Sequence, residues 1–387
     1  MRYNFDEIVD RKNTAAMKTD MASDGSSIGA DVLSMWIADM DFACAPPIVE
    51  AIKKAADRRI FGYTCYGKLG YFEAVEGFYM RRHGWKIDCK KAVYSCGVVS
   101  GLDGVVATLT EKSDKILIQP PVYAPFSGVI NSNGRTVVEN PLIRREDGGY
   151  DMDFDDLARK AADPDVKMMI LCSPHNPAGR VWTVEELTRV YDICRKNGVL
   201  LVCDEIHCDI VRRDVKHTPL LSLFPDAQDI IVCVAPTKTF NIAGLGVSLT
   251  VIPNDELRAK AEKALGGLTN PLSFAGATAA YSECDEWLDE LLEYIDGNFE
   301  HLRAELAEKL PKAKLAPREG TYLAWVDLSA YRADSLAFEK ELVEKGKLAL
   351  EAGARFGTGG EGYQRICLAC PRSLITEAVE RIKKTVE

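Results

Sequence analysis

The fold of this 387-residue chain is decided by residues 166–209, which read VKMMILCSPHNPAGRVWTVEELTRVYDICRKNGVLLVCDEIHCD. Short apolar runs at both ends flank a segment with the periodicity of an amphipathic helix. Thr183 and Glu186 have the spacing of a capping box at the start of this helix, and Gly198 provides its stop. The stretch therefore predicts a strand–helix–strand unit, whose parallel strands are joined by a right-handed crossover.

The same alternation of apolar runs and helical periods continues outward, from residue 92 to residue 255. The strand candidates are residues 92–95, 115–119, 166–172, 199–203, 230–234 and 247–252. Most of these runs are continuous in Val, Ile, Leu, Met and Cys, which is typical of strands buried on both faces. We therefore expect an α/β fold with a mostly parallel sheet that helices cover on both sides.

The pattern changes on either side of this region. Helices are predicted from residue 47 and over 71–83, and after residue 284 the regular alternation ends. The remaining predicted elements are a long helix over 286–309, strands at 321–327, 348–350 and 365–369, and helices at 335–346 and from 373. We expect a large α/β domain over 47–284, and a smaller α+β domain built from 1–46 and 285–387.

Composition and charge exclude several classes of protein. Hydrophobic residues make up 47% of the chain and charged residues 27%, as in ordinary globular proteins. The net charge of −10 argues against a nucleic acid or an anionic membrane as a partner. No apolar run reaches the ~20 residues that a membrane span needs. The N-terminus lacks the apolar core of a secretion signal, and the 12 cysteines are scattered. We expect a cytoplasmic protein.

Residues that could bind a ligand follow the predicted strands, at the edge of the sheet where ligands bind in open parallel sheets. In chain order they are Gly97, Tyr123, Asn176, Asp204 with His207, and Thr237 with Lys238. If the strands are assigned correctly, one edge brings together a helix N-terminus, an aromatic ring, an amide, a carboxylate and a lysine. Such a set indicates a binding site.

Each of these groups has a defined chemical use. The turn at Gly97 bares backbone N–H groups at a helix N-terminus, where a phosphate is stabilised. Tyr123 offers a flat face to an aromatic ring, and Asp204 can pair with a protonated ring nitrogen. Lys238, partly desolvated, would have a lowered pKa and could form a Schiff base with an aldehyde.

Asn176 and His207 can donate hydrogen bonds to a ring oxygen. A phosphate, a flat ring, a ring nitrogen and an aldehyde together describe pyridoxal 5′-phosphate. We expect this cofactor and no metal: Cys203 and Cys208 flank His207 without the spacing of a metal site, and Cys367-x-x-Cys370 is unaccompanied by a second such pair.

The motifs around these residues carry a family resemblance. Three of them resemble the fold-type I pyridoxal-phosphate enzymes: SPHNPAGRVW (173–182), CDEIHCD (203–209) and APTKTFNIAGLG (235–246). Four more are similar to the cystathionine β-lyase or C–S lyase subgroup, which is related to the class I and II aminotransferases: MWIADMDF (35–42), FGYT (61–64), QPPVYAPF (119–126) and RICLACPR (365–372). Because the motifs occur in order over nearly the whole chain, the resemblance is specific, and it implies a pyridoxal-phosphate-dependent transferase-like large domain.

The resemblance implies roles for individual residues. Lys238 matches the Schiff-base lysine, and Asp204 matches the partner of the pyridine nitrogen. Asn176 matches the amide near the ring oxygen, Tyr123 the stacking ring, and Arg365 the clamp for the substrate α-carboxylate, a task that suits a bidentate guanidinium.

Further roles concern the cofactor phosphate and the substrate entrance. The backbone of Val98 and Val99 matches the phosphate-binding turn. The candidates to balance the phosphate charge are Thr237, Lys238 and the helix N-terminus. Tyr63 matches a tyrosine that reaches the phosphate of the neighbouring subunit, so the resemblance implies a homodimer with its site at the interface. For Trp36 two roles stay open, lining the substrate entrance, which we favour, and anchoring the N-terminal segment.

Two departures from the aspartate-type aminotransferases narrow the function. Many of those enzymes carry a phosphate-binding arginine eight residues after the lysine, where this chain has Gly246. They carry a tyrosine three residues after the aspartate, where this chain has His207. Both differences argue against an aspartate-type aminotransferase, and the lyase subgroup remains compatible with a histidine at that position.

The resemblance to the lyase subgroup implies α,β-elimination on L-cystathionine, cysteine or a cysteine S-conjugate, which gives a thiol, pyruvate and ammonia. An aminotransferase using the same residues is the first alternative. A regulatory protein on the same fold is the second, although the presence of Lys238, Asp204, Asn176 and Arg365 together argues against an inactive enzyme.

Overall fold

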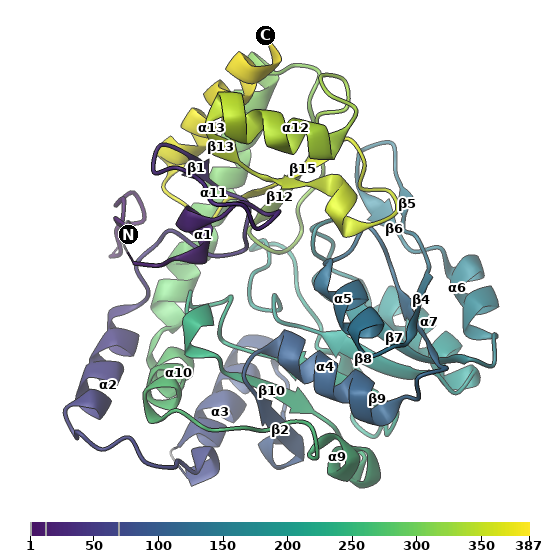
Figure 1. Ribbon diagram of the computed structural model, residues 1–387. Coiled ribbons are helices and arrows are strands. Elements are labelled where there is room, and N and C mark those ends of the chain that lie inside the picture. Colours follow the sequence, from purple (N-terminus) through teal and green to yellow (C-terminus); the bar gives the residue numbers. More distant parts are fainter. Residues whose placement is uncertain (1, 12–13, 69) are drawn as a thin grey trace.

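The computed structural model describes residues 2–11, 14–68 and 70–387. Its main element is a seven-stranded sheet, shown in the lower half of Figure 1. In spatial order the strands are β2 (Ala92–Ser95), β10 (Ser248–Val251), β9 (Ile230–Val234), β8 (Leu200–Asp204), β7 (Val166–Cys172), β3 (Lys115–Ile118) and β4 (Thr136–Glu139). Adjacent strands from β9 to β4 are parallel, whereas β10 runs antiparallel to both of its neighbours.

The expected α/β fold is confirmed. All six predicted strands of this region are present, with ends that differ by one residue at most. The sequence prediction missed β4, because this strand lies at the sheet edge, begins with the exposed Thr136 and is only partly buried. It also gave no direction for β10, since a continuous apolar run looks the same in either orientation.

Helices cover both faces of the sheet, and an apolar core lies between the helices and the sheet on each face. Alternate residues of β3 show the division, because Leu117 belongs to one core and Ile116 and Ile118 to the other. The helices α3 (Tyr71–His83), α6 (Phe154–Ala161), α7 (Val184–Lys196) and α10 (Pro271–Glu283) contribute to the first core. The helices α4 (Val98–Leu109), α5 (Pro125–Ser132) and α9 (Asp255–Ala261) contribute to the second.

The predicted helix of the deciding stretch is α7. The side chain of Thr183 accepts a hydrogen bond from the backbone of Glu186, and the Glu186 carboxylate accepts one in return, so the capping box is present. After the helix, Gly198 takes a φ of +68°, a left-handed conformation that glycine adopts without strain. Strand β8 then runs parallel to β7, as predicted.

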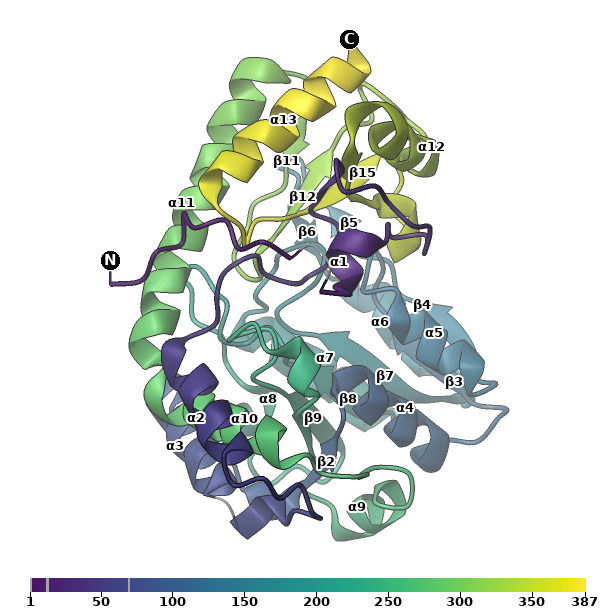
Figure 2. The same cartoon turned by 60° about the vertical axis from the view of Figure 1, so that its left-hand side comes forward.

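The C-terminal part forms a second, smaller sheet with its own core. Its strands are β11 (Lys314–Leu315), β12 (Leu323–Asp327), β15 (Tyr363–Cys367) and β14 (Glu351–Ala352). The flanking helices are α11 (Asp285–Lys309), α12 (Ser335–Glu341) and α13 (Arg372–Val386). Figure 2 shows α11 running along one side of the molecule past both sheets.

The N-terminal segment joins this smaller part. Strand β1 (Leu33–Ser34) pairs in parallel with β13 (Leu348–Ala349), and both views place α1 (Met17–Asp20) beside the smaller sheet (Figures 1 and 2). Apart from short 3-10 and π-helical turns, the other described elements are α2 (Pro46–Ala56), α8 (Leu220–Leu223), β5 (Ile143–Arg144) and β6 (Tyr150–Asp151). The domain boundaries near residues 46 and 284 stay predictions. Within the described part of the chain, no helix combines the length and apolar character that crossing a membrane requires.

Candidate active site

A cavity of about 420 Å³ lies beyond the carboxyl ends of the parallel strands. Among its lining residues are those that the sequence analysis singled out, with the exception of Tyr63: Trp36, Gly97, Val98, Val99, Tyr123, Asn176, Asp204, His207, Thr237, Lys238 and Arg365. A larger hollow, of about 1030 Å³, opens at the opposite edge, around the amino ends of β7, β8 and β9. Because the convergent polar groups surround the smaller cavity, we take that cavity as the candidate active site.

Lys238 follows strand β9 and points into this cavity from the sheet edge. Its Nζ donates a hydrogen bond to the backbone oxygen of Ala38 at 2.6 Å. Burial lowers the pKa of Lys238, although the carboxylates of Asp39 and Asp204 oppose the shift. The amine is therefore easier to deprotonate than an exposed lysine, as a nucleophile or a base requires.

Asp204 is the last residue of β8 and is almost fully buried. Its carboxylate accepts a hydrogen bond from the backbone N–H of Ile206 at 3.0 Å, and no Lys or Arg of the described chain pairs with it. Burial raises the pKa of Asp204 to about 7. A buried carboxyl group of this kind is suited to a cationic partner within the cavity, such as a protonated ring nitrogen.

His207 lies on the same loop and is also buried. Burial lowers its pKa to about 3, and the positive charges of Lys238 and Arg365 act in the same direction. Its Nδ1 has no hydrogen-bond partner among the described residues. The ring is therefore neutral, and one of its nitrogens is available to a ligand, which makes a cofactor contact chemically possible.

Arg365 lies on strand β15 of the smaller sheet. Its Nη1 donates to Oδ1 of Asn176 at 3.0 Å, and its Nη2 donates to the backbone oxygen of Trp36 at 2.9 Å. Nη2 also contacts the carboxylate of Glu351, a lining residue that the sequence analysis missed. The cross-strand register places Glu351 directly opposite Arg365, but sequence alone does not give this register.

The candidate phosphate cradle is the N-terminus of α4. Gly97 precedes this 12-residue helix with a φ of +124°, and Val98, Val99 and Ser100 follow it along the cavity wall. The free N–H groups of a helix N-terminus suit a phosphate. Tyr123 lines the same cavity, and burial raises its pKa to about 12, so its hydroxyl stays protonated.

The structure gives a reason for the absence of an arginine at position 246. Gly246 has a φ of +57°, and a Cβ atom built there would lie 2.8 Å from Sγ of Cys96. A larger residue would need both strained backbone and displacement of Cys96. The α4 N-terminus and the hydroxyls of Ser100 and Thr237 would therefore hold a phosphate mainly through neutral donors.

These residues fit pyridoxal phosphate on structural grounds. Asp204 is a buried carboxyl group without a cationic partner in contact, and His207 has an unpartnered ring nitrogen. Lys238 has a lowered pKa, and the α4 N-terminus opens onto the same cavity. The individual roles of these side chains stay predictions.

Tyr63 lies apart from this cavity. It follows α2, in the connection to α3, and its side chain is 97% exposed. Tyr63 does not line the cavity of its own subunit, and its expected contact with the phosphate of a neighbouring subunit stays a prediction.

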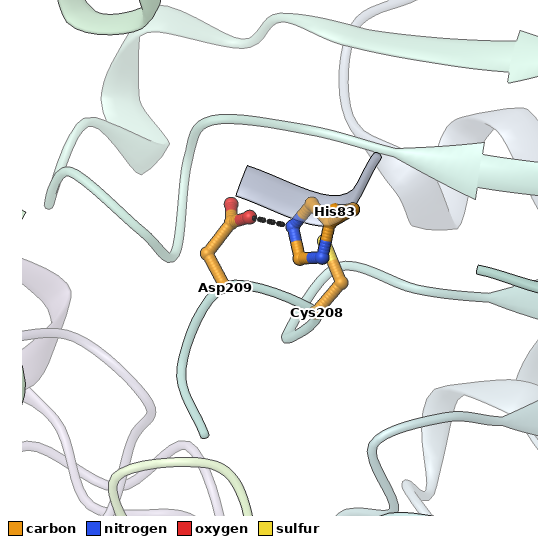
Figure 3. Close-up of side chains that lie close together, drawn as sticks. All are labelled: His83, Cys208 and Asp209. Carbon is orange, nitrogen blue, oxygen red and sulfur yellow. Dashed lines mark hydrogen bonds and ion pairs between the residues drawn. The ribbon is translucent and has the colours of Figure 1, made fainter. Parts of the chain in front are cut away.

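Figure 3 shows a second group of ionisable residues, His83, Cys208 and Asp209, which do not line the cavity. Nε2 of His83 and Oδ1 of Asp209 are 2.6 Å apart, and Asp209 also accepts a hydrogen bond from Thr239 at 2.7 Å. With Cys208, these two residues offer ligand atoms that lie within 4.8 Å of one another. Both carboxylate oxygens of Asp209 already have a hydrogen-bond partner, His83 on Oδ1 and Thr239 on Oδ2. We therefore interpret the group as a hydrogen-bonded support for the segment that carries Lys238, not as a metal site.

Comparisons with known proteins agree with this geometry. The family model for aminotransferase class I and II matches residues 30–382. The chain belongs to this family. It is 42% identical to cystathionine β-lyase PatB of Bacillus subtilis over 386 residues, which cover 98% of this chain and 99% of that relative. It is 25% identical to an aspartate aminotransferase of Pyrococcus horikoshii over 364 residues, which cover 92% of this chain and 91% of that relative.

The fold is also similar to those of solved pyridoxal-phosphate-containing structures. The pyridoxal-phosphate-bound C–S lyase of Staphylococcus hominis is 37% identical, with a TM-score of 0.93 and 99% coverage of both chains. Cystalysin of Treponema denticola, which also contains pyridoxal 5′-phosphate, is 34% identical with a TM-score of 0.94, over 100% of this chain and 99% of that one. The family is pyridoxal-phosphate-dependent, and the fold-type I architecture expected from the motifs is confirmed.

Proposed function

We propose that this protein is a pyridoxal-phosphate-dependent C–S β-lyase that eliminates the sulfur substituent of L-cystathionine or a related cysteine derivative. The observation that carries this proposal is similarity over nearly the whole chain to a relative named cystathionine β-lyase, at 42% identity. The cavity adds the chemistry, because a lysine, a buried carboxylate, an amide and an arginine converge in it. The products would be a thiol, pyruvate and ammonia.

The cofactor would be held by the residues already described. The α4 N-terminus would bind its phosphate, Tyr123 would lie against its ring, and Asp204 would keep the proton on the ring nitrogen. When bound, pyridoxal phosphate supplies an electron sink for the electron pair left on the substrate Cα. The negative charge of Asp204 would favour this, and its electrostatic effect is larger because the carboxylate is buried.

The substrate would be oriented by Arg365 and Asn176. The guanidinium group of Arg365 would pair with the α-carboxylate in a bidentate manner, while Asn176 holds Nη1 of the arginine in place. Trp36 lines the cavity on the side of the N-terminal segment and would exclude water there. These contacts would fix the Cα–H bond toward Lys238.

Lys238 would move the proton. With its pKa lowered by burial, the Nζ amine can accept the Cα proton. The leaving thiolate then needs a proton, and the protonated Nζ of Lys238 or the hydroxyl of Tyr123 can supply it. The high pKa of Tyr123, about 12, keeps that hydroxyl protonated until it is used.

The functional unit would be a homodimer. Tyr63 lies in a segment with other strongly exposed apolar residues, Ile60 at 77% and Phe61 at 61%, and Leu268 nearby is 80% exposed. A hydrogen bond from Thr269 to the backbone of Thr64 joins the two segments. Exposed apolar side chains gathered in this way favour a protein interface. In the dimer, Tyr63 of the partner subunit would reach the cofactor phosphate.

An aminotransferase is the second candidate, because the same residues would serve it. It is favoured by the family match and by the similarity to the aspartate aminotransferase of Pyrococcus horikoshii. The reactions differ in the step after proton removal: a lyase releases the group at Cβ, whereas an aminotransferase returns a proton to the cofactor.

Product analysis of the cofactor-loaded protein tests the proposal. With L-cystathionine as substrate, we expect homocysteine, pyruvate and ammonia in equal amounts, and we expect Lys238→Ala to abolish all three. A 2-oxo acid would be added in a parallel reaction. Transfer of the amino group to this acid without any release of homocysteine would refute the lyase assignment.

A further inference from the structure

Glu351 is a cavity residue to which the lyase chemistry above gives no role. It belongs to β14, directly opposite Arg365 on the antiparallel β15, and its side chain is 15% exposed. Its carboxylate contacts Nη2 of Arg365. Burial raises the pKa of Glu351, and the charge of Arg365 opposes that shift. A carboxylate of the chain itself thus lies on the guanidinium group proposed to bind the substrate carboxylate.

The hydrogen bonds of Arg365 show which of its N–H groups a substrate carboxylate would have to share. Nη1 donates one of its two N–H groups to Asn176, whereas Nη2 donates to the Trp36 carbonyl and contacts the Glu351 carboxylate. Nε has no hydrogen-bond partner in the described part of the chain. A bidentate carboxylate uses two neighbouring N–H groups of a guanidinium. The two edges of the guanidinium group that offer such a pair, Nε with Nη2 and Nη1 with Nη2, both include Nη2, so an incoming bidentate carboxylate meets Glu351 there.

We propose that Glu351 is a resident competitor, which occupies Arg365 until the substrate α-carboxylate displaces it and which thereby weakens the binding of carboxylates to the site. This inference rests on the proposed role of Arg365 in substrate binding. It adds a specificity-determining residue to the site.

Once Glu351 has been displaced from Arg365, no other unpaired cationic side chain lining the described cavity besides Lys238 can neutralise its charge. Lys238 and Arg365 are the lysine and arginine side chains that line the described cavity. Arg355, the other arginine near Glu351, is paired with Glu339 at 2.6 Å. The displaced Glu351 would therefore repel a second negative charge on the ligand. The site selects amino acids with an electrically neutral Cβ substituent over those with an anionic one.

Binding of unreactive carboxylates tests the proposal without catalysis. Propionate and succinate would be titrated calorimetrically into the cofactor-loaded wild type and into Glu351→Gln. We expect Glu351→Gln to bind propionate about tenfold more tightly, the effect of removing one charge-assisted competitor, and to gain more for succinate. Glu351→Ala serves as a second variant, with the same expected direction.

Two further variants fix the interpretation. Glu341→Gln removes the same charge from α12, where the carboxylate pairs with Arg332 outside the cavity lining, and should leave both affinities unchanged. Arg365→Gln should abolish propionate binding. Unchanged or weaker affinity in both Glu351 variants, or propionate binding that survives Arg365→Gln, would overturn the proposal. Because no pyruvate is measured, this outcome is independent of the lyase assignment.

Discussion

At the scale of single residues, the site is defined by buried groups with few partners. Asp204 has one hydrogen bond from a backbone amide, and Nδ1 of His207 has no partner in the described structure. Burying a carboxyl group in this way costs folding free energy unless a ligand compensates. These residues were predictable from sequence because both lie at or just beyond the carboxyl end of the buried strand β8. Glu351 was not, since its significance depends on the register between β14 and β15.

The pKa of Asp204 leads to a prediction for the cofactor-free protein. Because its pKa is about 7 in the folded state, against about 4 in the unfolded chain, ionisation destabilises the fold progressively from pH 4 to pH 7. Asp204→Asn removes this penalty. We expect the variant to be more stable than the wild type by about 2 kcal/mol at pH 8, and by less at pH 5, in urea unfolding of both apo-proteins. A difference that does not change with pH would contradict the assignment.

At the scale of elements, the deciding stretch folds as its local signals indicate. The capping box at Thr183, the helix α7 and the stop at Gly198 were all predictable, because these signals act over three to five neighbouring residues. The long periodic helices, such as α11, were predictable for the same reason. Edge strand β4 and the direction of β10 depend on contacts with distant strands, which the local sequence does not encode.

The N-cap of α7 provides an element-scale prediction. Thr183→Ala removes the side-chain acceptor for the Glu186 amide and should lower the free energy of unfolding by about 1 kcal/mol. The matched control is Thr188→Ala on the same helix, whose hydroxyl bonds only to the preceding turn and which should be neutral or slightly stabilising. Urea unfolding of the three proteins measures both. Equal stabilities for the two variants would contradict the role of the cap.

At the scale of the whole molecule, two sheets and their helices bring distant parts of the chain to one cavity. Trp36 comes from the N-terminal segment, Lys238 from the end of β9, and Arg365 from β15. The motifs around these residues made the convergence predictable. The chain alone does not complete the site as proposed, because Tyr63 is exposed and lies outside the cavity.

The proposed dimer depends on the apolar segment around Tyr63. Phe61→Asp places a charge among exposed apolar residues and should shift the protein to monomers in light scattering, because an unpaired charge would have to be buried at the interface. Leu336→Asp changes an equally apolar residue on α12, 46% exposed, and should leave the dimer intact. A dimeric Phe61→Asp protein would place the interface elsewhere.

The central claim is that the site eliminates a sulfur substituent, and the number of pyruvate molecules formed per active site tests it most directly. The cofactor-loaded protein would be incubated with excess L-cystathionine and no added 2-oxo acid. The account predicts sustained release of pyruvate over many turnovers per site. Release that stops, with the cofactor converted once per site to its amine form and turnover restored only by a 2-oxo acid, would contradict it and identify an aminotransferase.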